Sequence, residues 1–131
     1  PTNSWSNRVV QDAMNICSQS NSFLEAIPAL TNHIINREYS YGTVAPEILA
    51  ITLSVLHFSE NSFDKAISMA TTIGKTAESV PALVGALAGA LDSDSIDNNV
   101  WTIHLKELKG ISIPKMKDVN YIELINRFVN P

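Results

Sequence analysis

The chain has 131 residues, of which 45% are hydrophobic and 17% charged, a composition typical of a globular protein. This length suits one domain, and we expect residues 1–131 to form a single helical domain. The formal net charge of -4 lacks the basic excess of nucleic-acid-binding proteins, so we expect no nucleic-acid partner.

The N-terminal third is expected to form two helices. Ser22 and Glu25 have the spacing of a capping box, which predicts the start of the second helix. Pro28 predicts a kink or a late start for that helix. Apolar residues recur at helical spacing in both segments; they are Trp5, Val9, Val10, Ala13, Ile16 and Cys17, then Ile27, Leu30, Ile34 and Ile35.

The middle of the chain predicts a loop and two further helices. The loop covers Glu38 to Gly42. Pro46 suits the first turn of a helix that ends near Phe58. Ser62 is a good N-cap for the next helix, which we expect to end at Gly74 as its C-cap.

A fifth helix is predicted to begin near Ser79, with Pro81 in its first turn. Glycine is costly inside a helix, so its small residues Ala82, Gly85, Ala86 and Gly89 indicate a face pressed against another helix. Beyond it we expect a helix from Ile96 to Leu108, a connector from Gly110 to Lys117 and a closing helix from Val119 to Val129. No segment has strand periodicity, so the predicted class is all-α, with about six to seven helices.

Membrane insertion and secretion are not expected. The apolar run from Val80 to Leu91 is about half the length of a membrane-spanning helix. The N-terminal residues lack the basic and apolar regions of a signal peptide. Cys17 is the only cysteine, so no intramolecular disulfide can form, and the expected compartment is the cytoplasm. Proline at position 1 fits either removal of an initiator methionine or a fragment of a longer protein.

The stretch from Ile73 to Leu91 joins a polar turn to a helix rich in small residues. It resembles a signature of the ADP-ribosylglycohydrolase superfamily, in which a Gly-Gly-Asp-Thr-Asp-Thr turn supplies metal ligands and a Gly-Ala-x-x-Gly-Ala helix follows. Segments 42–51 and 61–70 are similar to the family's glycine loop and to the helix that leads into the metal turn. The resemblance covers residues from about Tyr39 to Leu105 and implies the fold of the family's C-terminal half.

The resemblance implies a candidate site at this turn. The family's two glycines correspond to Gly74 and Lys75, its first aspartate to Thr76, its second to Glu78 and its last threonine to Ser79. Magnesium prefers anionic oxygen ligands, so a site formed by Thr76, Glu78 and Ser79 is degenerate, and magnesium binding is expected to be weak or absent. Ser79 and Glu78 also fit simple capping of the following helix.

The resemblance also implies a ligand and its contacts. Tyr41, Gly42 and Gly74 are candidate ligand-binding residues for an ADP-ribose-type ligand. The three histidines are scattered, which does not indicate a zinc site, and a lone cysteine such as Cys17 is more typical of a core than of a nucleophile. The alternating aspartates Asp92, Asp94 and Asp97 are typical of helix capping and solvated charge.

Three functions remain open at this stage. Family members have a second metal cluster that includes paired aspartates, and this chain has no Asp-Asp pair. We therefore expect a degenerate or truncated member that does not catalyse hydrolysis alone, and we assign no catalytic residue. One alternative is the C-terminal segment of an active magnesium-dependent ADP-ribosyl hydrolase that another segment completes. The other is a helical interaction module without a ligand, with a second copy or a complementary chain as its partner.

Overall fold

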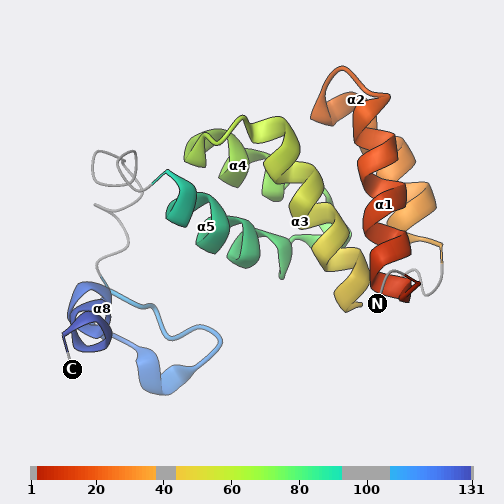
Figure 1. The fold of residues 1–131 in the computed structure, drawn as a ribbon. Helices are drawn as coiled ribbons and strands as arrows, with labels where there is room; N and C mark the ends of the chain where they lie inside the picture. The colour runs from red at the N-terminus through yellow and green to blue at the C-terminus, as the bar shows by residue number, and fades with distance from the viewer. Residues whose placement is uncertain (1–2, 38–43, 93–106, 131) are drawn as a thin grey trace. The chain divides into compact units, whose positions relative to one another are not determined.

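The computed structural model describes residues 3–37, 44–92 and 107–130 (Figure 1). Six α-helices lie in this part of the chain, together with short π and 3-10 turns and one isolated β-bridge. The all-α prediction is confirmed. The chain divides into two compact units, residues 1–93 and 94–131, which are described separately. No helix in the described ranges is long and apolar enough to cross a membrane.

The first two helices begin at the expected caps. Helix α1 spans Trp5–Ser18 and buries Val9, Ala13 and Cys17, as its apolar spacing predicted. Helix α2 spans Phe23–Leu30, and Ser22 Oγ accepts a hydrogen bond from Glu25 N–H (3.3 Å). The Glu25 carboxylate in turn accepts from Asn21 N–H (2.9 Å), one residue before the position that a standard capping box uses.

Pro28 lies inside α2, so the predicted late start is wrong. The helix continues beyond it as a π turn, Thr31–Ile35, in which Asn36 N–H donates to Thr31 O (2.9 Å). Such wide turns occur frequently at functional sites.

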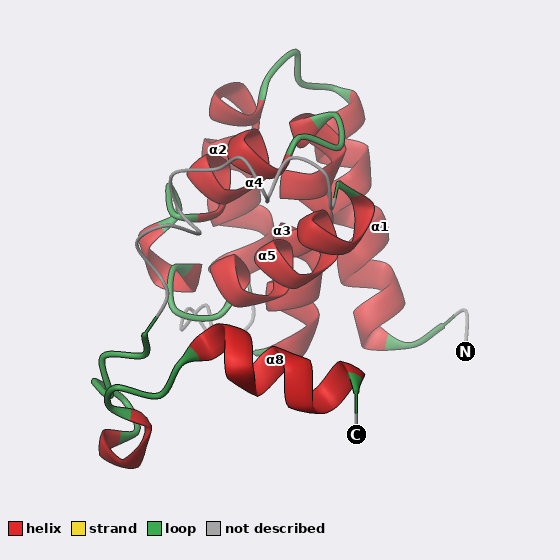
Figure 2. Ribbon diagram, turned by 90° about the vertical axis from the view of Figure 1, so that its left-hand side faces the viewer, coloured by secondary structure: helices red, strands yellow, loops and turns green. Residues whose placement is uncertain are grey.

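Helix α3, Ala45–Ser59, lies between α1 on one side and α4 and α5 on the other (Figure 1). Pro46 occupies its first turn, as predicted. Most of the helix is buried, since it contacts helices on opposite sides; its buried apolar residues include Ile48, Ala50, Ile51 and Val55. Figure 2 shows the chain turned by 90° about the vertical axis, with helices α1 to α5 of the first unit labelled. Helix α3 therefore forms the centre of the first unit.

Helix α4 spans Phe63–Ala70 and begins at Ser62, whose Oγ accepts from Lys65 N–H (3.4 Å). The predicted end at Gly74 is wrong. The Thr71 and Thr72 hydroxyls donate to Ser68 O and Met69 O (3.1 and 2.6 Å), so two of the last four carbonyls of the helix are bonded before the glycine is reached.

Helix α5 spans Val80–Leu91 with Pro81 in its first turn, as expected. Its buried face consists of Val80, Val84 and Ala88. The predicted small face is only partly correct, because Ala82 and Ala86 are exposed. Gly85 does face another helix: a Cβ added there would lie 3.3 Å from Ile67 Cδ1 of α4.

The opposite ends of α4 and α5 are joined by a side chain. Asp92, which directly follows α5, accepts a hydrogen bond from Phe63 N–H in the first turn of α4 (3.3 Å). Asp92 therefore caps a neighbouring helix, in agreement with the capping expected of it, and fixes how α4 and α5 pair.

The second unit contains a closed loop and helix α8, Tyr121–Val129. Leu108 N–H donates to Val119 O (3.0 Å) and Asp118 N–H to Leu108 O (2.9 Å), so Glu107 and Leu108 pair with the far side of the loop. The helix expected from Ile96 to Leu108 lies outside the described residues except for this end, where the prediction is wrong. The closing helix is confirmed, starting two residues later than predicted.

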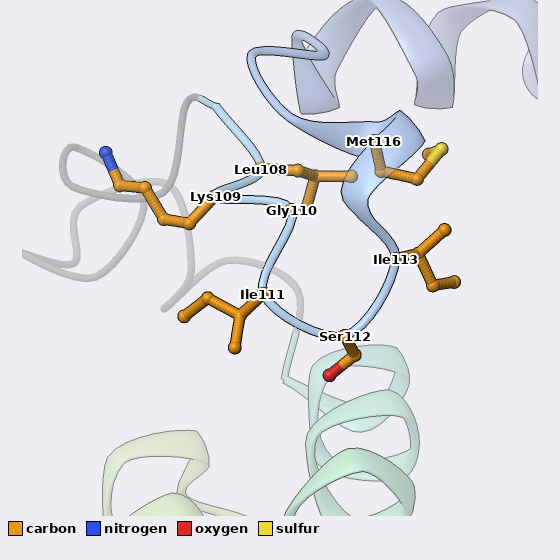
Figure 3. A pocket seen from close by; sticks show the side chains of 7 residues that line it. All are labelled: Leu108, Lys109, Gly110, Ile111, Ser112, Ile113 and Met116. Atoms are coloured by element: carbon orange, nitrogen blue, oxygen red, sulfur yellow. The ribbon is translucent and has the colours of Figure 1, made fainter.

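The loop of the second unit borders a shallow pocket of about 330 Å³ that is largely open to solvent (Figure 3). Its lining is mostly apolar; it comprises Leu108, Lys109, Gly110, Ile111, Ser112, Ile113 and Met116. Ile111 and Ile113 are largely exposed. Gly110 has a φ of 68°, and a Cβ there would lie 2.7 Å from Lys117 Cβ, so the loop requires glycine at this position. No candidate site residue predicted from the sequence lies in this loop.

Candidate functional site

The candidate site is the turn from Ile73 to Ser79, which connects α4 to α5. It begins with a 3-10 turn, Gly74–Thr76. Three backbone hydrogen bonds hold it: Thr76 N–H to Ile73 O (3.0 Å), Ala77 N–H to Gly74 O (3.3 Å) and Ser79 N–H to Thr76 O (3.1 Å). The turn is therefore shaped by its own backbone.

Thr76, the first predicted metal ligand, points into the protein. Its side chain is buried, with 1% of the residue exposed. The hydroxyl donates a hydrogen bond to Ile73 O (3.1 Å). In this arrangement Thr76 closes the turn and presents no oxygen to solvent.

Glu78 and Ser79 lie at the start of α5. Glu78 is exposed and Ser79 is half-buried. Ser79 occupies the N-cap position, but its side chain makes no capping hydrogen bond. Ser79 is thus the N-cap by position only, and the Glu78 carboxylate is the only anionic group in the turn.

Of the candidate ligand-binding residues, the structure describes one. Gly74 is exposed, and a Cβ added to it would meet no atom within 4 Å. The surface around Gly74 is therefore open. Tyr41 and Gly42 lie outside the described residues.

The family comparison agrees with this part of the fold. The model of the family described as ADP-ribosylglycohydrolase matches residues 3–124. The chain belongs to the ADP-ribosylglycohydrolase family. No curated protein and no solved structure matches it. The match includes helices α1 to α5 and the turn between α4 and α5, and it extends upstream of the region in which the sequence motifs were found.

Within the described part of the chain, the oxygen donors of this turn do not fit a magnesium ion. Magnesium binds several oxygens in near-octahedral geometry and relies on carboxylates. The turn offers one carboxylate, Glu78, while Thr76 faces inward. Among the described residues no group of three histidine, cysteine, aspartate or glutamate side chains is placed to hold a metal.

A basic side chain of the turn makes a contact that could not be predicted from the sequence. Lys75 Nζ donates to Asn36 Oδ1 at 2.6 Å, between residues 39 positions apart. Asn36 ends the π turn that follows α2. The adjacent Arg37 is anchored in turn, since its Nη1 lies 2.6 Å from Asp12 Oδ2 of α1. Lys75 thus links the candidate turn to the segment that leads into residues 38–43.

Two buried groups on α3 were also missed. Glu47, in the first turn of α3, is 1% exposed although it carries a carboxyl group. Ser54 is fully buried and forms a hydrogen bond with Cys17. Burial raises the pKa of the Cys17 thiol, and the hydrogen bond with Ser54 offsets part of that rise. A raised pKa disfavours the thiolate, so Cys17 has the environment of a core residue and not of a nucleophile.

Proposed function

We propose that this ADP-ribosylglycohydrolase-family chain binds an ADP-ribose-type ligand at the turn from Gly74 to Ser79 and does not hydrolyse ADP-ribosyl bonds by itself. The observation that carries the proposal is the state of Thr76: the family's aspartate position holds a hydroxyl that is buried and bonded to Ile73 O. Hydrolysis with two metal ions requires carboxylates on both sides of the ion pair, and the chain contains no Asp-Asp pair.

Binding is supported by features of the turn that do not depend on a metal. The backbone hydrogen bonds of the turn persist without carboxylates. The turn leads into the N-terminus of α5, where the helix dipole favours anionic groups. The surface over Gly74 is open to a ligand.

The proposal is tested by calorimetric titration of the chain with ADP-ribose, with and without magnesium, and by an assay for release of ADP-ribose from an ADP-ribosylated protein. We expect binding without release. Release that depends on this chain and magnesium would show that it is a complete hydrolase. Absence of binding under both conditions would contradict the proposed binding of an ADP-ribose-type ligand.

The position of the site is tested by Gly74→Trp. Because no atom lies near an added Cβ, the indole ring should be tolerated by the fold and should cover the turn. We expect it to abolish ADP-ribose binding. Leu24→Trp is the matched control, since Leu24 is 72% exposed on α2 and is not part of the turn.

A second candidate function, binding to a protein partner, is favoured by the surface of α5. Leu83, Leu87 and Leu91 are 44%, 43% and 64% exposed and recur every four residues along the helix. Exposed apolar stripes of this kind mark interaction surfaces, which fits a second copy or a complementary chain. Light scattering over a concentration series, compared with Leu87→Lys, would detect self-association through this face.

A further inference from the structure

The loop of the second unit holds two isoleucines in solvent. Ile111 is 89% exposed and Ile113 is 61% exposed. Their side chains point away from the loop, on its opposite sides (Figure 3). The loop itself is closed by the backbone, because Leu108 N–H donates to Val119 O (3.0 Å). The isoleucines are therefore presented by a closed loop and are not covered by it.

Helix α8 of the same unit also exposes an apolar face. None of its residues is buried. Its exposed apolar side chains recur at helical spacing; they are Tyr121, Ile122, Ile125, Phe128 and Val129. The polar residues Glu123, Asn126 and Arg127 occupy the opposite face. Amphipathic helices with apolar and aromatic residues on one face are typical of segments that lie in the plane of a membrane surface.

The loop is basic as well as apolar. Its residues 108–117 include Lys109, Lys115 and Lys117 and no acidic residue. All three lysines are exposed. Within the described ranges, none of them forms an ion pair. Lysines of this kind are attracted to the anionic headgroups of a lipid membrane.

We propose that the loop from Leu108 to Val119 and helix α8 bind the surface of an anionic lipid membrane. In this arrangement Ile111 and Ile113 enter the headgroup region and the lysines contact lipid phosphates. A protein interface needs a continuous patch of about 800 Å² on each partner, whereas fluid lipid surrounds side chains that point in different directions, as these isoleucines do. Binding at the surface is distinct from insertion of a spanning helix, and it is independent of the proposed ADP-ribose site.

Cosedimentation of the full chain with lipid vesicles tests the proposal. One set of vesicles contains phosphatidylcholine alone, and the other contains phosphatidylcholine mixed with phosphatidylserine. We expect the chain to sediment with the mixed vesicles and to stay in solution with the neutral ones. Added salt should release it, because the lysine contacts are exposed and screened.

The apolar contacts are tested by Ile111→Ser, Ile113→Ser and Phe128→Ser. Each should weaken binding to the mixed vesicles about tenfold, since each removes one apolar side chain from the lipid. Leu24→Ser is the matched control, because Leu24 is 72% exposed on α2 of the first unit. Ile111→Trp should keep binding, and its added fluorescence should shift to shorter wavelength on mixed vesicles, whereas that of Leu24→Trp should not.

The charged contacts are tested by Lys109→Gln, Lys115→Gln and Lys117→Gln. Each should weaken binding to the mixed vesicles about fivefold, the factor expected for one lysine near an anionic surface. Lys65→Gln is the matched control, since it removes one exposed charge from α4 in the first unit.

Three results would overturn the proposal. The first is equal binding to both kinds of vesicle or to neither. The second is an equal loss in the loop variants and in their controls. The third is a chain that ignores vesicles and binds polyglutamate, which would assign the loop to an acidic protein. None of these variants lies in the turn from Gly74 to Ser79, so each of these results leaves the proposed function standing.

Discussion

Replacing Thr76 by aspartate tests whether the turn can be returned to a metal-binding state by one substitution. This change restores the carboxylate found in the family motif. Thr76 is 1% exposed, however, and its hydroxyl bonds to Ile73 O (3.1 Å), so the new carboxylate would be buried beside a carbonyl oxygen. Burial disfavours a charged group and raises the pKa of an aspartate. We therefore expect Thr76→Asp to destabilise the protein.

The size of the effect follows from this burial. A rise of about 2 pH units in the folded-state pKa of the new aspartate corresponds to about 2.7 kcal/mol at neutral pH, since each unit is about 1.4 kcal/mol. For a chain of this size that is a fall in Tm of about 10 °C. Because the folded pKa exceeds the unfolded value of about 3.9, the part of the destabilisation that comes from the charge should be absent below about pH 4 and complete above about pH 6 to 7.

Thermal unfolding from pH 3 to pH 8 measures this effect. Thr76→Asn is the matched control, because it has the shape of aspartate and also lacks the threonine hydroxyl but carries no charge. The difference between the two variants isolates the charge. Equal Tm values for Thr76→Asp and Thr76→Asn at pH 7 would refute the argument, since they would mean that the side chain at this position reaches solvent.

The same variants test the magnesium argument. Magnesium at a hundred times its dissociation constant would stabilise a site formed by Thr76→Asp by about 2.7 kcal/mol. We expect no such recovery, because the side chain at position 76 faces Ile73 O and away from Glu78, which is exposed. A rise in Tm with magnesium that is specific to Thr76→Asp would show that the turn still holds a metal.

Three further predictions concern the helices. Gly85→Ala should stabilise the first unit by about 0.5–1 kcal/mol in thermal unfolding, because alanine has the higher helix propensity. Only the flexible end of Ile67, 3.3 Å from the added Cβ, must shift. A destabilisation that Ile67→Val rescues would show that this steric contact outweighs the gain in helix propensity. Cys17 is buried, so it should react with a thiol reagent only after the protein unfolds. Because burial raises the pKa of this thiol, the free energy of unfolding should fall as the pH rises above about 8.5, and Cys17→Ala should abolish this pH dependence. Asn120 Oδ1 accepts hydrogen bonds from Ile122 N–H and Glu123 N–H (2.9 and 3.2 Å) and so caps α8. Asn120→Ala should therefore lower the stability of α8 by about 1 kcal/mol, measured as faster amide hydrogen exchange in this helix. Unchanged exchange would contradict the role of Asn120 as the cap.

The elements that the sequence predicted best depend on local chemistry. Ser22 and Ser62 cap their helices through their own side chains, and Pro46 and Pro81 lie in first turns, because these preferences act over three or four residues. The end of α4 was predicted wrongly for a reason that is also local. The hydroxyls of Thr71 and Thr72 bond to carbonyls of the last turn before Gly74 is reached, and the preference of glycine for the C-cap position does not account for such bonds.

The candidate site was less predictable, because motif correspondence places residue types and not side-chain directions. Thr76 corresponds to a metal ligand in the motif, yet its hydroxyl faces Ile73 O. The contact between Lys75 and Asn36 depends on how α2 and its π turn pack near α4, which no pattern within either segment encodes. The burial of Glu47 was missed because an acidic residue in a first turn is usually a solvated charge.

The way this turn is held explains how a family member can retain the fold while its metal-binding residues change. Its shape comes from backbone hydrogen bonds and from the Thr76 hydroxyl, none of which needs a carboxylate or a metal. Helix α5 is fixed by its buried residues Val80, Val84 and Ala88 and, at its far end, by Asp92 on Phe63 N–H. Because these interactions lie within the protein, loss of a surface charge at the turn leaves them intact.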